Sequence, residues 1–235
     1  MNDLNEQAYT AVLFFLDLAG TFIFSITGAF KAVKYELDIL GVIVLALLTG
    51  IGGGMIRDSL LGDFPVAALQ SEAYFAVCLI GALLVFFLAA RIAYLWKWVK
   101  IGDALGLAIF TVIGAAKGYA LGLGPFGVAV SGMLTACGGG VIRDLMVREI
   151  PTVIRTDFYA TAAILGSWLL YALTRWTPLS PAVVLTVSGF FVFILRVTAM
   201  RLKLNLPRVK AMPAPPEEMR RRYREEKRNR KGGSR

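Results

Sequence analysis

Long apolar runs separated by short polar segments fill the first 200 residues of the chain. Each run holds about 20 residues, enough to cross a hydrocarbon core of about 30 Å as a helix. The pattern predicts an all-α integral membrane protein with seven transmembrane helices, at roughly 9–33, 38–61, 72–95, 101–122, 125–147, 157–176 and 181–201. A soluble domain would need more polar residues to cover its surface, because 57% of this chain is hydrophobic.

The sequence repeats itself at an offset of 86 residues, since TGIGGGMIRDSLLGDFP ends at Pro65 and TACGGGVIRDLMVREIP ends at Pro151. The register continues upstream without a gap, so that equivalent residues coincide: Asp17 with Asp103, Phe24 with Phe110, Gly28 with Gly114, and Lys31 with Lys117. We therefore expect a first three-helix repeat over 9–95, a second over 96–176, a seventh helix over 177–203 and a basic cytoplasmic tail over 204–235.

An odd number of spans in each repeat predicts that the second copy enters the membrane in the opposite sense, as an inverted repeat. The loop charges predict the orientation. With the N-terminus outside, the cytoplasmic segments carry Lys31, Lys34, Arg91, Lys97, Lys100, Arg143, Arg148 and Arg155, whereas the outer segments carry only Arg57, Lys117 and Arg175. This asymmetry follows the positive-inside rule and favours a multi-pass protein of the cell inner membrane with a cytoplasmic C-terminus. The N-terminus lacks the basic start of a signal peptide, so we expect the first span to be retained.

The net charge of +9 lies entirely at the C-terminal end of the chain. Residues 1–200 hold 12 Lys or Arg and 12 Asp or Glu, whereas residues 201–235 hold 13 and 4. A neutral apolar body argues against nucleic-acid binding, and the tail is expected to be solvated or to touch anionic lipids. The chain has no histidine, and Cys78 and Cys137 lie in apolar runs without metal-ligand spacing. We therefore expect neither an enzyme nor a metal site or cofactor.

Each repeat carries three consecutive glycines inside a predicted membrane span: Gly52, Gly53 and Gly54 in the first, and Gly138, Gly139 and Gly140 in the second. Three neighbours spread over about 200° of a helix, so one packing face cannot use all of them. We expect a kink or an unwound turn, whose carbonyl oxygens could bind a cation beside a water-filled path. Close helix packing through small residues is the alternative.

An Arg-Asp pair follows each glycine triplet, as Arg57-Asp58 and Arg143-Asp144. On a span over 38–61 the first pair lies about 10 Å beyond the midplane, where charges usually pair or face a wet cavity. The pairs are candidates for a polar pore wall or gate, or for structural ion pairs.

A second matched set comprises Asp17 and Lys31 in the first span and Asp103 and Lys117 in the fourth. Asp17 and Lys31 are about 21 Å apart along a helix, so they could mark the two ends of a wet pathway. Interfacial anchoring with a snorkelling lysine is the alternative.

The doubled GGGxxRD signature in a seven-span body resembles the bacterial TRIC-type family, relatives of the trimeric intracellular cation channels, which is also described as glycine-transporter-like. The resemblance covers residues of about 10–200. It implies a homotrimer with a pathway for monovalent cations, chiefly K⁺, in each protomer, lined by the first two spans of each repeat. It also implies contact with membrane lipids, for which Lys117 is the candidate residue.

Two transport functions fit these features. A passive K⁺-permeable channel is the leading hypothesis, and a secondary transporter of a small amino acid such as glycine is the alternative, because inverted repeats suit both. A carrier would use Arg57 or Arg143 together with an aspartate to hold a carboxylate and an ammonium group.

Overall fold

The computed structural model describes residues 3–92, 96–155 and 158–202, and residues 217, 219 and 221–223 of the tail. Every element in these ranges is helical. The long helices are α1 (Asp3–Lys34), α2 (Ile39–Leu61), α4 (Glu72–Ile92), α5 (Trp96–Ala120), α6 (Pro125–Met146), α8 (Ala160–Trp176) and α9 (Pro181–Leu202). Two single-turn helices, α3 (Ala67–Gln70) and α7 (Thr152–Arg155), precede α4 and α8. The expected all-α fold is confirmed for the described residues.

Five of the described helices are long and apolar enough to cross a membrane: α1 from Thr10, α2, α5 from Trp98, α6 and α9. The other two long helices, α4 and α8, occupy the predicted third and sixth spans. The helix α4 has 21 residues, and α8 has 17 residues. The protein is therefore an all-helical membrane protein in which at least five described helices have the length and composition of membrane spans.

Local sequence signals set the ends of the helices. The Asp38 carboxylate accepts a hydrogen bond from the Gly41 backbone N–H at 2.7 Å and thereby caps the N-terminus of α2. Pro125 begins α6, where a missing N–H costs nothing. Gly62 (φ 71°) directly follows α2, and Arg148 (φ 57°), two residues after the end of α6, has the same left-handed backbone conformation.

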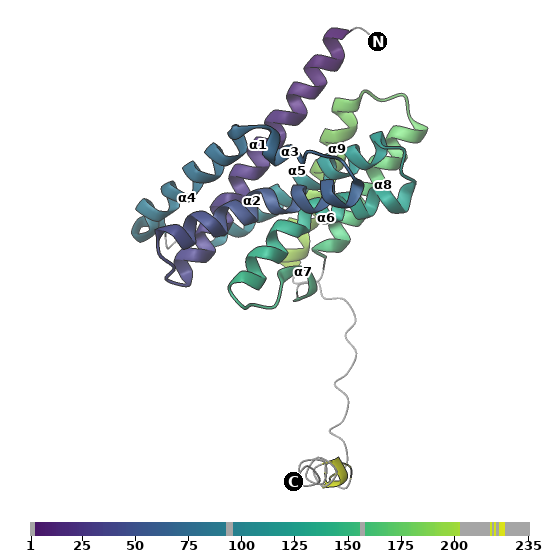
Figure 1. Cartoon of the computed structure of the whole chain (residues 1–235). Helices are drawn as coiled ribbons and strands as arrows, with labels where there is room; N and C mark the ends of the chain where they lie inside the picture. Colours follow the sequence, from purple (N-terminus) through teal and green to yellow (C-terminus); the bar gives the residue numbers. More distant parts are fainter. Residues whose placement is uncertain are drawn as a thin grey trace, which may run out of the picture. The chain divides into compact units, whose positions relative to one another are not determined.

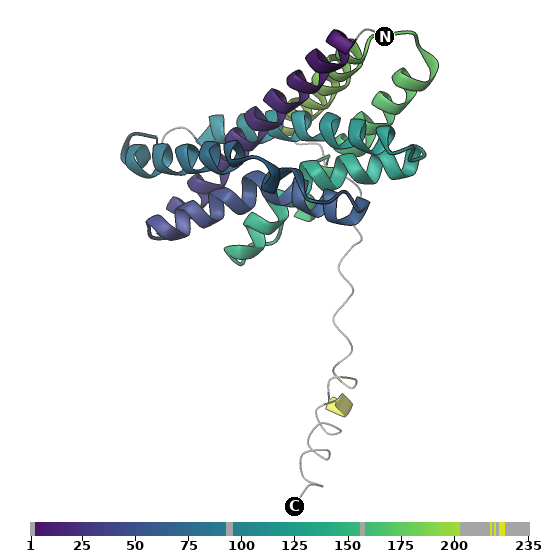
Figure 2. The same ribbon diagram turned by 45° about the horizontal axis from the view of Figure 1, so that its top comes forward.

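The two repeats pack in the same way. α1, α2 and α4 contact one another, as do their equivalents α5, α6 and α8. The repeats meet where α2 packs on α6 and α1 packs on α5, and α9 packs on α5 and α8 without an equivalent helix on the other side. Figures 1 and 2 show α1, α2 and α4 on one side of the bundle and α8 and α9 on the other.

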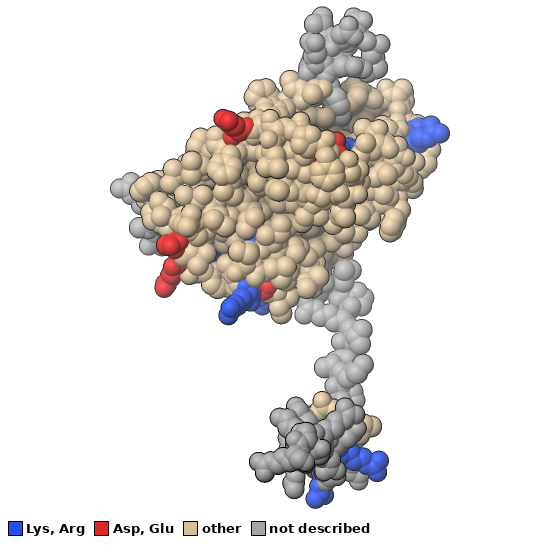
Figure 3. All heavy atoms as spheres, in the orientation of Figure 1, with Lys and Arg blue, Asp and Glu red and all other residues tan. Residues whose placement is uncertain are grey.

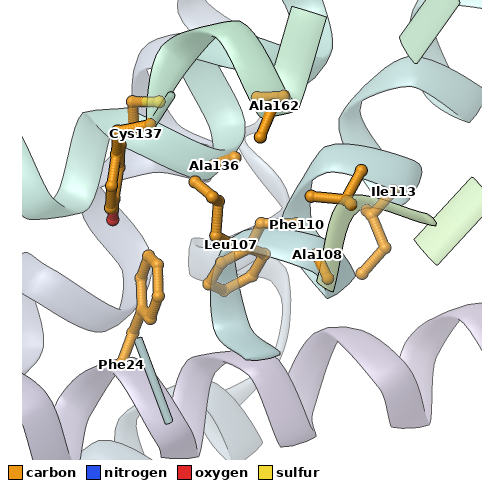
Figure 4. Close-up of a cluster of buried hydrophobic side chains, with 11 residues drawn as sticks. Phe24, Leu107, Ala108, Phe110, Ile113, Ala136, Cys137 and Ala162 are labelled. Carbon is orange, nitrogen blue, oxygen red and sulfur yellow. The ribbon is translucent and has the colours of Figure 1, made fainter. Parts of the chain in front are cut away.

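An aromatic pair stabilises the contact between α1 and α5. Phe24 and Phe110, which are equivalent in the two repeats, meet edge to face with 5.0 Å between ring centroids. Figure 4 shows this pair beside Leu107, Ala136 and Cys137. These side chains form a buried hydrophobic cluster, and Cys137 is part of it, as expected of a small buried hydrophobic residue.

The outer surface of the body is apolar. Phe87, Phe126 and Phe190 are 73%, 76% and 66% exposed, a pattern typical of side chains that face lipid. In Figure 3 the visible face of the body carries only a few isolated charged groups. Residues 206–235 form a separate unit, and they include most of the basic tail.

Candidate functional site

The two glycine triplets meet at the crossing of α2 and α6. A Cβ atom added to Gly53 would collide with the backbone oxygen of Thr135, and one added to Gly139 would collide with the backbone oxygen of Thr49. These contacts are equivalent in the two repeats, so a pseudo-two-fold axis relates them. Glycine is required here because the two backbones touch, with Cα–H groups facing carbonyl oxygens.

The structure shows no unwound turn at the glycine triplets, and a kink in either helix stays a prediction. Both helices are α-helical throughout, from Ile39 to Leu61 and from Pro125 to Met146. The packing alternative explains the triplets better, because residues of each triplet face the other helix closely. The expected helix break rested on the low helix propensity of glycine, which a close tertiary contact overrides.

The first half-site is centred on Asp58, which is 1% exposed. Its Oδ1 accepts hydrogen bonds from Arg57 Nε at 2.7 Å and Lys117 Nζ at 2.6 Å. Its Oδ2 accepts one from the backbone N–H of Ala67 at 3.0 Å. Lys117 also forms an ion pair with Asp63. The buried carboxylate thus has two cationic partners, one from each repeat.

The second half-site repeats this arrangement around Asp144, which is fully buried. Oδ1 accepts from Arg143 Nε at 3.0 Å and Lys31 Nζ at 3.2 Å. Oδ2 accepts from the Thr152 backbone N–H at 2.8 Å and hydroxyl at 2.7 Å. Lys31 also pairs with Glu149 at 2.7 Å. Because Lys31 and Lys117 are equivalent, each repeat provides the lysine that neutralises the other repeat's carboxylates.

These exchanged ion pairs fix which helix ends lie together. Lys31 in the last turn of α1 contacts Asp144 near the end of α6, so α1 and α6 end on the same side of the bundle. Lys117 in the last turn of α5 contacts Asp58 near the end of α2. Equivalent helices of the two repeats therefore end on opposite sides, as inverted repeats require.

The outer acid of each half-site is positioned by the left-handed turn that ends the helix. After Gly62, the backbone N–H of Asp63 donates to the Asp58 carbonyl at 2.9 Å, and after Arg148 that of Glu149 donates to Asp144 at 2.9 Å. These bonds close the last turn and direct both acids toward the lysine of the other repeat.

Glu149 is also bound by Lys34 at 3.4 Å and by the hydroxyl of Tyr35. It lies between α6 and α7, outside the membrane-spanning helices. The hydrogen bond from Lys31 and then that from Tyr35 lower the pKa of Glu149 from 4.5 to about 2. The same contact with Glu149 raises the pKa of Tyr35. Glu149 therefore remains an anion over the whole physiological pH range.

Asp17 and Asp103 lie further along α1 and α5 and have different partners. Asp17 accepts a hydrogen bond from the Tyr74 hydroxyl at 2.7 Å. Asp103 accepts one from Arg143 Nη1 at 3.2 Å. The structure thus links Asp103 to the second half-site by a direct bond. Asp17 lines a small cavity together with Arg57, Asp58 and Tyr74.

Sequence reasoning missed Asp63, Glu149, Tyr35, Tyr74 and Thr152 as members of these half-sites. The offset of 86 residues places Asp63 on Glu149, two acids at the end of equivalent helices, and this signal could have identified both. Across the described part of the chain, no group of three or more Cys, Asp or Glu side chains has the arrangement of a metal site. The half-sites are networks of hydrogen-bonded charges that join the two repeats.

A family model described as "Glycine transporter" matches residues 14–90 and 100–175. The two segments lie within the two predicted repeats. The chain is 37% identical over 198 residues to UPF0126 inner membrane protein YadS of Escherichia coli (strain K12), a match that covers 83% of this chain and 95% of that protein.

Solved structures show the same similarity. A structure described as the basis for conductance through TRIC cation channels matches with a TM-score of 0.80 and 36% identity, covering 85% of this chain and 98% of that one. The TRIC trimeric intracellular cation channel orthologue from Rhodobacter sphaeroides matches with a TM-score of 0.78 and 36% identity, covering 82% and 99%. The chain therefore belongs to the family described as "Glycine transporter", and its resemblance to the bacterial TRIC-type proteins is confirmed.

Proposed function

We propose that this protein is a channel for monovalent cations, chiefly K⁺, that works as a homotrimer with a pathway inside each protomer. The observation that carries the proposal is the match to bacterial TRIC cation channels over 98% of a solved chain at 36% identity. A solved prokaryotic TRIC channel studied in 0.5 M KCl matches with a TM-score of 0.78 and 33% identity. Monovalent cations, membrane lipids and two further copies of the chain are the proposed partners.

The proposed pathway runs between the two repeats, lined by α1 and α2 of the first and α5 and α6 of the second. Its waist lies at the glycine crossing of α2 and α6, and the two half-sites lie on either side of it. Asp58 and Asp144 lie nine residues after Thr49 and Thr135, whose carbonyls touch the other helix, so each half-site is about 13 Å from the crossing. Two charged gates flanking an apolar waist fit a channel with a symmetric path.

The lysines are the proposed gates of this pathway. Lys117 lies between Asp58 and Asp63, and Lys31 lies between Asp144 and Glu149. Withdrawal of a lysine would leave two carboxylates facing the path, and a ring of carboxylates attracts cations. In the closed state the ammonium group of Lys117 or Lys31 therefore occupies the position between the two carboxylates that a permeant cation would take.

We further propose seven spans, with α4 and α8 as the third and sixth, an extracellular N-terminus and a cytoplasmic C-terminus in the cell inner membrane. The positive-inside pattern supports this orientation. It places the half-site of Lys31 and Glu149 on the cytoplasmic side and that of Lys117 and Asp63 on the outer side. Glycine transport, which the family description names, is the second candidate function.

Purified protein in planar bilayers separates the two candidates. A channel gives discrete single-channel steps in symmetric KCl, with a reversal potential that follows the K⁺ gradient. A carrier gives saturable counterflow of glycine in proteoliposomes without current steps. Glycine counterflow together with a silent bilayer would overturn the channel proposal.

A further inference from the structure

Among the buried side-chain atoms of the described residues that have no hydrogen-bond partner, two flank the glycine crossing, one on each side. They are Nη1 of Arg57 and the hydroxyl of Tyr159. Both side chains are almost completely buried, at 3% and 2% exposure. A buried polar group without a partner is costly, so each calls for a structural explanation.

In the first half the carboxylate of Asp17 is bound by tyrosine. The Tyr74 hydroxyl donates to Asp17 Oδ2 at 2.7 Å, whereas Arg57 donates a hydrogen bond from Nε to Asp58. Asp17, Arg57 and Tyr74 all line the same cavity of about 10 Å³. That volume holds about one water molecule. The arginine thus stands across a water-sized space from a carboxylate that it does not bind.

In the second half the equivalent carboxylate, Asp103, is bound by arginine. Arg143 Nη1 donates to Asp103 Oδ1 at 3.2 Å and to the Thr27 hydroxyl at 3.1 Å. In this half the Tyr159 hydroxyl has no hydrogen-bond acceptor, although the charges of Asp103 and Arg143 both act on it. Its ring instead lies under the Arg196 guanidinium of α9, 4.7 Å from ring centroid to Cζ.

Tyr74 and Tyr159 are structural equivalents. Each lies seven residues after the residue whose backbone N–H binds the central carboxylate, Ala67 in the first half and Thr152 in the second. Each half therefore contains the same carboxylate, the same arginine and the same tyrosine, but pairs them differently. In each half the unpartnered atom belongs to the side chain that does not bind the carboxylate: Arg57 where Tyr74 binds Asp17, and Tyr159 where Arg143 binds Asp103.

The sequence gives a reason for the difference. Thr27, the second acceptor of Arg143, is replaced at the equivalent position of the other repeat by Ile113, which cannot accept a hydrogen bond. Arg57 therefore has no counterpart of the hydrogen bond that Arg143 donates to the Thr27 hydroxyl. The added helix α9 also contributes Arg196 to the second half alone.

We propose that Tyr74 and Tyr159 are positioning residues of the cation path. Each tyrosine competes with the arginine of its own repeat for the carboxylate of Asp17 or Asp103. That half of the path is open when the tyrosine binds the carboxylate and closed when the arginine binds it. This inference rests on the proposed channel function. The tyrosine-bound arrangement leaves water-sized space beside the arginine, and the arginine-bound arrangement draws the carboxylate across it. The structure holds the two halves in opposite states, and conduction requires the tyrosine-bound state in both.

Phenylalanine substitutions provide the test, with Tyr171→Phe on α8 as a matched control outside both halves. Tyr159→Phe removes a hydroxyl that has no partner at rest, so the melting temperature should be unchanged or higher. The open probability should nevertheless fall about fivefold, because the open state of the second half loses one ordinary hydrogen bond that stabilises it. A wild-type open probability in Tyr159→Phe would overturn the proposal.

A second pair of variants acts on the arginines. Thr27→Ile removes an anchor of Arg143 and should raise the open probability, whereas Ile113→Thr adds an anchor for Arg57 and should lower it. Shifts of the same sign in both variants would contradict the competition.

A structure of Tyr74→Phe separates this proposal from the channel function. Asp17 should move to Arg57, as Asp103 binds Arg143, whether or not the protein conducts. An Asp17 carboxylate that stays away from Arg57 overturns the switch, whereas a silent wild-type protein with Asp17 on Arg57 overturns only the channel.

Discussion

Replacing the glycines one at a time should divide each triplet into residues that touch the other helix and residues that do not. In Gly53→Ala the new methyl group meets the Thr135 carbonyl oxygen, a backbone atom that moves only if α2 and α6 move apart. In Gly54→Ala its nearest neighbour is Arg57 Nη2 at 3.8 Å, an ordinary van der Waals distance. The two substitutions are chemically identical and adjacent, so Gly54→Ala is the matched control.

The magnitudes follow from two opposing effects. Forcing an extra methyl group into a filled contact costs about 1–3 kcal/mol. Alanine in place of glycine returns up to about 1 kcal/mol of helix propensity. We therefore expect Gly53→Ala to lower the free energy of unfolding by up to about 2 kcal/mol, whereas Gly54→Ala should be neutral or stabilising by up to about 1 kcal/mol.

Equilibrium unfolding in detergent micelles measures the free energy of unfolding of both variants. Planar-bilayer recording shows how far the separation of α2 and α6 changes the conductance. Gly139→Ala and Gly140→Ala repeat the comparison in the other repeat. The double variant Gly53→Ala with Gly139→Ala should lose less than the sum of the single losses, because one separation of the helices accommodates both methyl groups. Equal destabilisation by Gly53→Ala and Gly54→Ala would refute the packing explanation.

Three further predictions concern the charged groups. Asp58→Asn leaves two cations facing a neutral amide and should lower the free energy of unfolding by about 3–5 kcal/mol. Where the variant folds, it should rectify K⁺ current in the opposite sense to Asp144→Asn. Rectification in the same sense would exclude gates on opposite sides of the membrane. The ion pairs of Glu149 should stabilise the protein fully above pH 4.5 and progressively less as the pH falls toward its native pKa of about 2, so the acid loss of melting temperature should be smaller in Glu149→Gln. A cysteine at Arg175 should react with an impermeant thiol reagent applied outside intact cells and one at Arg148 should not, and labelling at 148 would contradict the proposed topology.

The sequence repeat predicted which residues are equivalent, but it could not predict which residues meet. Aligning Asp17 with Asp103 and Lys31 with Lys117 suggested a path along the first span of each repeat. The structure instead pairs each lysine with the acids of the other repeat, because the inverted copies pack with the end of α1 against the end of α6. Such exchange depends on the docking of the repeats, which a single sequence does not contain.

The same limit applies to the tyrosines and the glycines. Tyr74 and Tyr159 are offset by 85 residues rather than 86, so a fixed register hides their equivalence. The glycine triplets were recognised as special, but helix propensity alone pointed to a broken helix. The contact that explains Gly53 comes from a carbonyl on another helix, 82 residues away in sequence.

The exchange of lysines between the repeats also constrains how the protein is made. Lys31 precedes its partner Asp144 by 113 residues, and Asp58 precedes Lys117 by 59. At a synthesis rate of about 5–20 residues per second, Lys31 waits roughly 6–23 s for Asp144 to be translated. During this interval Lys31 has no Asp144 to pair with, and Asp58 has only the adjacent Arg57, so the nascent first repeat is an incomplete folding unit. Synthesis of the second repeat supplies Asp144 for Lys31 and Lys117 as the second cationic partner of Asp58.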